Sequence, residues 1–193
     1  MNNKTLSLLA LLGAPTMALG VLGGYYFPSL GDSWFTATWG IIYITTWMAG
    51  VVCMQRMKAT GNSRFGKALL WILICTLTIA DISNTFWVIY PEGKPDAFFY
   101  LDLCWPLSHL LMLPVGIMVI LAKGLPGWYR YVPLAQGFWL PVALGSKFAW
   151  GEAESSLYLG CVYSAVAWVL MSLILYRQSQ KEEIHSTSVL QTA

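Results

Sequence analysis

Apolar residues fill the chain in long runs, and short polar segments interrupt these runs at nearly regular intervals. A helix needs about 20 mainly apolar residues to cross the roughly 30 Å of hydrocarbon in a bilayer. Six runs meet this requirement, and they are Thr5–Phe27, Trp34–Met54, Ala68–Tyr90, Ala97–Ala122, Tyr131–Phe148 and Ser155–Tyr176. The pattern therefore predicts an all-α integral membrane protein with six transmembrane helices.

The connections between these runs are short and contain residues that end helices. Residues Pro28–Ser33, Pro91–Asp96 and Gly124–Gly127 each include both Pro and Gly, which interrupt helical hydrogen bonding or allow unusual dihedral angles. Short connections make consecutive helices antiparallel neighbours. We expect one antiparallel bundle over residues 1–177, followed by a short polar tail, residues 178–193, that is disordered.

Two of the six runs allow another interpretation. Leu6–Gly20 resembles the apolar core of a signal peptide, but the run continues to Phe27, and cleavage would leave the orientation of the other helices unchanged. The Tyr131–Phe148 run is the weakest of the six, because it contains Pro133 and Pro141 and therefore predicts a broken or strongly kinked helix.

The positions of the charged residues predict the orientation. Nine of the eleven Lys and Arg residues fall on one side of the predicted bundle, at Lys4, Arg56, Lys58, Arg64, Lys67, Lys123, Arg130, Arg177 and Lys181. The other side carries Asp32, Glu92, Asp96, Glu152 and Glu154 with Lys94 and Lys147. Cytoplasmic loops are enriched in Lys and Arg, so both termini are expected to be cytoplasmic.

Composition supports the membrane class and narrows the partners. Hydrophobic residues make up 57% of the chain and charged residues 10%, which is typical of a membrane protein with the lipid bilayer as its surroundings. The net charge of +2 and the lack of a basic, aromatic-rich patch give no reason to expect a nucleic acid partner. A short chain without an organelle signal favours the bacterial inner membrane.

Two ionisable residues, Asp81 and His109, lie inside apolar runs, where such side chains are rare and commonly functional. Counted at 1.5 Å per residue from the intervening connection, they lie about 15 Å and about 19 Å deep. Asn84 and Asp102 lie about 10 Å and about 9 Å deep. In an antiparallel hairpin, the depths predict that Asp81 meets His109 and that Asn84 meets Asp102.

Helical periodicity places these residues on polar stripes. The stripe on the third helix contains Cys75, Thr78, Asp81, Asn84 and Thr85, and that on the fourth contains Asp102, Trp105, His109, Met112 and Gly116, with Ser108 beside it. We predict a ligand-binding or proton-coupling site formed by Asp81, His109, Asp102, Asn84, Ser108 and Trp105. The alternative is that these residues form structural hydrogen bonds between helices.

Prolines and aromatic residues add to this picture. Pro106 frees the carbonyl of Asp102 and predicts a kink there, and Pro114 follows in the same run. Six deep aromatic residues either line a pocket or pack in the core, and they are Trp39, Tyr43, Trp47, Trp105, Trp139 and Trp168. Gly20 and Gly24 predict close approach of another helix.

Several chemistries are disfavoured. The four cysteines, Cys53, Cys75, Cys104 and Cys161, are isolated within the runs, so no metal or redox motif is present. A single histidine in the membrane leaves bis-histidine haem without a second ligand. Ser108 and His109 are adjacent, and their side chains diverge by about 100° on a helix, which excludes the obvious catalytic triad. We therefore predict no cofactor and no metal, and we name no catalytic residue.

Three functions are compatible with the sequence. The leading hypothesis is binding or transport of a hydrophobic or weakly polar ligand through a cavity lined by Asp81 and His109. The first alternative is a membrane enzyme that uses the same two residues as acid and base on a lipid-like substrate. The second is a non-catalytic assembly partner that forms a homo-oligomer or binds another membrane protein, through Gly20 and Gly24.

Overall fold

The computed structural model describes residues 1–31, 33–90, 95, 97–151 and 153–191. Helices dominate this part of the chain, and no strand occurs in it. Five helical stretches are long and apolar enough to cross a membrane, and they are Asn3–Tyr26, Trp34–Arg56, Arg64–Ile89, Ala97–Ala122 and Glu154–Lys181. The chain therefore has the helices of a multi-pass membrane protein.

The first spanning stretch consists of two helices, α1 (Asn3–Gly13) and α2 (Thr16–Tyr26). The break lies next to Pro15, whose ring removes one backbone donor and clashes with the carbonyl four residues earlier. A short 3-10 helix, η1 (Pro28–Leu30), follows α2.

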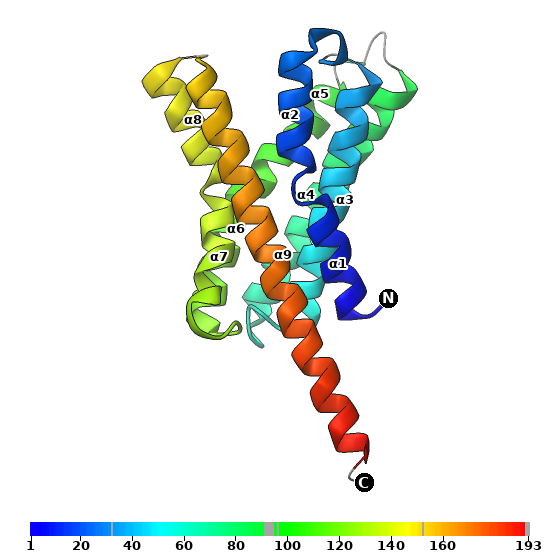
Figure 1. The fold of residues 1–193 in the computed structure, drawn as a ribbon, viewed down its shortest axis with the longest axis vertical. Coiled ribbons are helices and arrows are strands. Elements are labelled where there is room, and N and C mark those ends of the chain that lie inside the picture. Colours follow the sequence, from blue (N-terminus) through cyan, green and yellow to red (C-terminus); the bar gives the residue numbers. More distant parts are fainter. Residues whose placement is uncertain (32, 91–94, 96, 152, 192–193) are drawn as a thin grey trace.

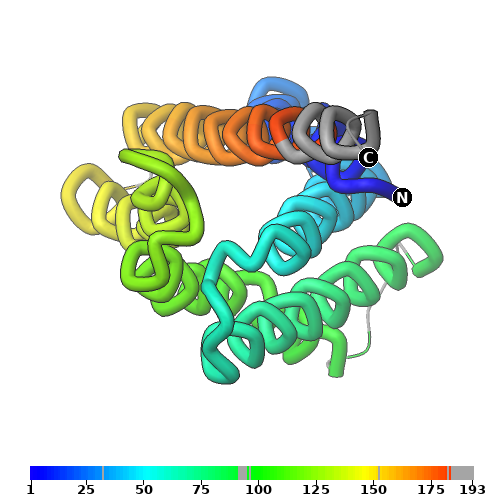
Figure 2. The backbone as a smooth tube through the Cα atoms, turned by 90° about the horizontal axis from the view of Figure 1, so that it is seen from below, coloured from blue at the N-terminus to red at the C-terminus, as the bar shows by residue number. Residues whose placement is uncertain are grey.

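Two continuous helices come next, α3 (Trp34–Arg56) and α4 (Arg64–Ile89). Both agree with the predicted runs to within four residues at each end. Ser33 and Ser63 cap them, because each side chain accepts a hydrogen bond from a backbone N–H of the first turn. Helix α3 packs against α1, α2, α4 and α9, and Figure 2 shows it between α4 and the side of the bundle that α1 and α9 form.

The fourth stretch is divided into α5 (Ala97–Asp102) and α6 (Cys104–Ala122). The predicted kink at Asp102 is confirmed, because the helices separate at Leu103, three residues before Pro106. Pro114 lies inside α6 without ending it.

The fifth run is broken, as its prolines predict. After η2 (Gly127–Tyr131), it forms α7 (Val132–Gly137) and α8 (Trp139–Trp150), which separate at Phe138, three residues before Pro141. Figure 1 shows α7 and α8 following one another along α9, and both contact that helix. Neither is among the stretches long enough to cross a membrane by itself.

Helix α9 (Glu154–Gln191) extends beyond the predicted run. Residues 178–191, which we expected to be disordered, are helical, and Gln, Lys and Glu favour helix formation there. Ser179 Oγ lies 3.3 Å from Ser7 Oγ, and Lys4 pairs with Glu183 at 3.1 Å.

Contacts at the N-terminus define one end of the bundle. Arg56, at the end of α3, donates a hydrogen bond to the Met1 carbonyl at 2.6 Å. The N-terminus, the end of α3 and the part of α9 around Ser179 and Glu183 therefore lie together at what we call the terminal end, and η1 lies at the far end (Figure 1). The predicted acidic side included Asp32, Glu92, Asp96 and Glu152, with Lys94, and these five lie outside the described residues.

The glycines of α2 allow close packing within the chain. A Cβ atom on Gly20 would lie 2.2 Å from the ring of Trp39, and one on Gly24 would lie 3.5 Å from the Cα atom of Gly31. Gly20 therefore serves the contact between α2 and α3.

Candidate ligand-binding site

A cavity of about 160 Å³ lies between α3, α4, α5 and α6, toward the far end. Its lining consists of Thr36, Trp39, Gly40, Tyr43, Ile44, Asn84, Trp87, Asp102 and Trp105. We call it the polar cavity. Three of the six residues that the sequence predicts for the site, Asn84, Asp102 and Trp105, meet here, and the predicted proximity of Asn84 and Asp102 agrees with this placement.

The helix geometry brings these polar groups to the cavity. A Cβ atom on Gly40 would lie 2.8 Å from Nδ2 of Asn84, so the glycine leaves room for the amide. Asp102 ends α5 and Trp105 lies in the first turn of α6, so both flank the break between the helices. Within the described part of the chain, neither the Asp102 carboxylate nor the Asn84 amide has a hydrogen bond or ion pair. These groups can therefore bind a ligand.

Aromatic side chains form most of the remaining lining. Four rings, those of Trp39, Tyr43, Trp87 and Trp105, line the polar cavity, and the described Lys and Arg residues do not. Electron-rich ring faces attract cations, and tryptophan does so most strongly. Together with one carboxylate, this lining is suited to a positively charged organic group.

His109 is fully buried behind the polar cavity. Its ring lies among four indoles, with centroid distances of 4.6 Å to Trp139, 4.8 Å to Trp47, 5.0 Å to Trp105 and 5.5 Å to Trp168. Nδ1 lies 3.0 Å from the carbonyl oxygen of Trp105, and Nε2 lies 3.4 Å from the hydroxyl of Tyr43. Because a carbonyl only accepts, Nδ1 donates, and Nε2 of the neutral ring accepts from Tyr43.

The predicted pair of Asp81 and His109 does not form. Thr45 on α3 donates a hydrogen bond to Oδ2 of Asp81 at 2.8 Å, and Oδ1 is buried without a partner. The reason is the rotation of α4. Ser108 on α6 donates to Thr76 at 2.8 Å, so Thr76 faces α6. Asp81, five residues later, is rotated by about 140° from Thr76 and faces α3.

The residues of the predicted polar stripe therefore lie on one face of α4. That face borders α3 and not α6. The hydroxyl oxygen of Thr78 lies 3.4 Å from the sulfur of Met48 on α3, and Asn84 packs against Gly40. Ser108 is fully buried, and its hydroxyl is engaged by Thr76 and by the Cys104 carbonyl at 2.7 Å. This arrangement gives Ser108 a structural contact between α4 and α6.

A second, larger cavity of about 340 Å³ lies between α2, α6, α8 and α9. Its lining is mostly apolar and consists of Met17, Ala18, Val21, Trp105, Trp139, Leu140, Ala143, Leu144, Lys147, Ser156, Leu157, Gly160 and Cys161. We call it the apolar cavity. Leu144 is 48% exposed, so this cavity borders the surface of the bundle. Trp105 lines both cavities.

The predicted site omitted several residues that line the polar cavity. Trp39 and Tyr43 were recognised only as deep aromatic residues, and their spacing of four places them on one face of α3. Trp87 and Thr36 carry no signal that separates them from interfacial or packing residues. Comparison with protein-family models, curated proteins and solved structures gives no match.

Proposed function

We propose that this membrane protein binds or transports a small organic cation, such as an alkylated ammonium ion, in the polar cavity. The observation that carries the proposal is the meeting of one carboxylate, Asp102, with four aromatic rings around about 160 Å³ of space. Such an ion carries a full positive charge, so it differs from the hydrophobic or weakly polar ligand that the sequence predicts, and the carboxylate of Asp102 in the lining is the reason for the change.

Each group has a role in this function. Asp102 balances the charge of the ligand. The amide oxygen of Asn84 accepts a hydrogen bond from the ligand. Each cation–π contact contributes about 0.5–1 kcal/mol when exposed and about 2 kcal/mol when desolvated. His109 is a positioning residue, because it holds Tyr43 and Trp105 in place.

Titration calorimetry of the protein in detergent micelles tests the proposal, with choline and its uncharged isostere 3,3-dimethyl-1-butanol as ligands. We expect saturable binding of choline, and binding of the alcohol at least about tenfold weaker, which corresponds to 1.4 kcal/mol. Asp102→Asn should weaken choline binding by a similar factor. Glu154→Gln is the matched control, because Glu154 bonds to Tyr25 outside the polar cavity. Equal affinity for choline and the alcohol, or no binding of choline, would refute the proposal.

The apolar cavity favours a second candidate, binding of a hydrophobic molecule. Its volume of about 340 Å³ lies at the lower end of the range for small-molecule sites. Ala143→Trp would fill this cavity, whereas Val166→Trp places the same ring on an exposed position of α9. Mass spectrometry of co-purified small molecules should show a compound that the first variant loses and the second retains.

We also propose six membrane crossings with both termini in the cytoplasm of a bacterial inner membrane. The course of α7 and α8 along α9 supports a sixth crossing. The cations that flank the described helices at the terminal end, such as Arg56, Arg64 and Lys123, support the orientation.

A further inference from the structure

Polar side chains occupy a part of the bundle surface that faces away from the core. Thr45, Cys75, Thr78 and Thr85 are exposed along α3 and α4, and Asp81 is partly buried among them. We call these five residues the α3–α4 stripe. Thr45 is the middle residue of α3 and bonds to Asp81, so this pair lies near the middle of the α3 span.

The threonines of the α3–α4 stripe have their hydrogen bonds within the chain. Thr78 donates to the Ile74 carbonyl at 2.8 Å, and Thr85 donates to the Asp81 carbonyl at 2.9 Å. The Asp81 carboxylate, in contrast, receives one hydrogen bond, from Thr45, and no described cation pairs with it. Asp81 is therefore the group whose charge is not compensated.

A charge at the bilayer centre costs about 2.5–3.5 kcal/mol on insertion scales, and such residues face a bundle interior or pair with another group. We infer that the α3–α4 stripe docks a transmembrane helix of another protein, which places a Lys or Arg side chain against Asp81. The partner approaches from the exposed side, where Thr45 bonds to Oδ2 of Asp81, whereas Oδ1 faces inward and is buried.

A second copy of this chain does not supply that cation. The described Lys and Arg residues lie in connections or near helix ends, as Arg56 and Lys67 show, except for Arg177 and Lys181. These two lie inside α9, but at the end of its membrane-spanning part and away from the depth of Asp81. A homodimer across the stripe would bring two Asp81 carboxylates to the same depth, where they repel. The charge pattern therefore favours a different protein.

Energy transfer in phosphatidylcholine vesicles tests this inference. The probes are two dye-labelled leucine-rich transmembrane peptides, one with a central Lys and one with Leu at that position. We expect the Lys peptide to associate with the labelled protein at least tenfold more tightly, and Asp81→Asn to abolish the difference. Glu154→Gln, which removes an acid outside both the stripe and the polar cavity, should preserve it.

Several results would overturn the inference: equal association of both peptides, no association of either, or energy transfer between copies of the protein that requires Asp81. Circular dichroism and the melting temperature show whether Asp81→Asn is folded. Because the stripe and the polar cavity are measured by different ligands, failure of one proposal leaves the other standing.

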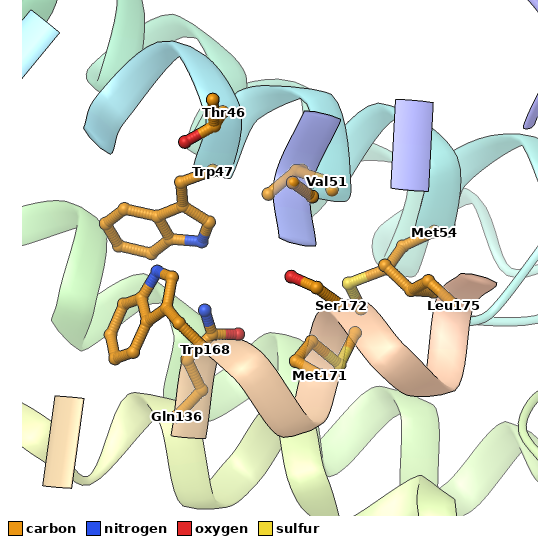
Figure 3. Close-up of a pocket in the computed structure, with 11 residues that line it drawn as sticks. Thr46, Trp47, Val51, Met54, Gln136, Trp168, Met171, Ser172 and Leu175 are labelled. Atoms are coloured by element: carbon orange, nitrogen blue, oxygen red, sulfur yellow. The ribbon is translucent and has the colours of Figure 1, made fainter. Parts of the chain in front are cut away.

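An independent observation concerns the centre of the bundle. A small cavity of about 10 Å³, which we call the core cavity, is lined by residues of α1, α3, α7 and α9. Figure 3 shows the ring nitrogens of Trp47 and Trp168, the amide of Gln136 and the hydroxyl of Ser172 directed toward this space. All four residues are at least 96% buried, and both indole N–H groups have no hydrogen-bond partner.

We infer that the core cavity binds one water molecule, which joins α3, α7 and α9. A cavity of about 10–15 Å³ is sufficient for one water, which forms two to four hydrogen bonds. The water accepts from the two indoles, which only donate, and donates to Gln136 and Ser172, which can accept. No described Lys or Arg lines the core cavity, and an unpaired ion there would be costly.

Nuclear magnetic resonance of protein labelled with ¹⁵N in its indoles tests this site. The Trp47 and Trp168 indole protons should show cross-relaxation with a water proton. Trp139 is the control, because its indole donates to the Gly160 carbonyl at 2.9 Å. Absence of cross-relaxation with water at both indoles would contradict the inference. Indole resonances that shift with halide concentration would also contradict it, because they would identify the occupant as an anion.

Discussion

The hydroxyl of Tyr43 lies 3.4 Å from Nε2 of His109, so a residue that lines the polar cavity from α3 contacts the buried imidazole of α6. The other ring nitrogen contacts the main chain of Trp105, which lines the same cavity. A ligand that displaces either residue therefore acts on the same imidazole. This relationship gives His109 a positional role in place of the expected pairing with Asp81.

Tyr43→Phe should lower the free energy of unfolding by about 1–3 kcal/mol, because it leaves Nε2 of the fully buried His109 without a hydrogen-bond donor. Tyr163→Phe is the matched control. Its hydroxyl donates to the Ala135 carbonyl at 2.7 Å at an exposed position, where water can replace it, so its removal should cost about 0.5 kcal/mol. Denaturation in detergent micelles measures both values. A smaller loss for Tyr43→Phe than for Tyr163→Phe would contradict the assignment.

Gly116→Ala should destabilise the bundle by about 1–3 kcal/mol, the usual range for overpacking. An added Cβ atom would lie 2.4 Å from the Cα atom of Leu134, and this backbone atom of α7 cannot rotate away. Gly145→Ala in α8 meets nothing within 4 Å and should be neutral or stabilising, because alanine favours helices. Melting temperatures of the two variants check this prediction. Equal decreases in melting temperature for Gly116→Ala and Gly145→Ala would disprove it.

The contact between Ser108 and Thr76 should show a coupling energy of about 0.6 kcal/mol, the average for hydrogen bonds between membrane helices. A double-mutant cycle with Ser108→Ala and Thr76→Val measures it. Choline affinity should change little in either variant, because neither residue lines the polar cavity. A tenfold loss of affinity in the single variants would instead place Ser108 in the binding site.

Labelling of introduced cysteines with an impermeant maleimide tests the proposed topology. In a background without native cysteines, Lys58→Cys and Trp128→Cys should react only after the membrane is opened, and Ser29→Cys and Ala153→Cys should react in intact cells. Labelling at Trp128 and Ala153 tests whether α7 and α8 together cross the membrane, because these helices lie between the two positions. Reaction of both from the same side would refute it.

The sequence predicts the helices well because hydrophobic length and proline chemistry are local properties. Pro106 and Pro141 each lie three residues after a helix break, and the continuous helices α3 and α4 agree closely with their apolar runs. The extension of α9 was missed, because the polar segment after Tyr176 lacks an apolar run but contains good helix formers.

The candidate site was predicted only in part. Depth along the helices placed Asn84 near Asp102, but depth alone could not determine the rotation of α4. This helix carries two polar faces: Thr76 and Ser83 bond toward α6 and α5, whereas Asp81 bonds to α3. Periodicity shows which residues share a face, and only tertiary packing shows which neighbour that face meets.

The helix breaks divide the bundle into parts with different mechanical behaviour. Helices α3, α4 and α9 run without interruption, so a displacement at one end of them is transmitted to the other. The remaining three segments consist of shorter rods joined at Pro15, Leu103 and Phe138. The break at Leu103 lies beside the polar cavity, because Asp102 and Trp105 flank it. A change in the angle between α5 and α6 would therefore move these two lining residues relative to one another, whereas α3 and α4 form a continuous opposite wall.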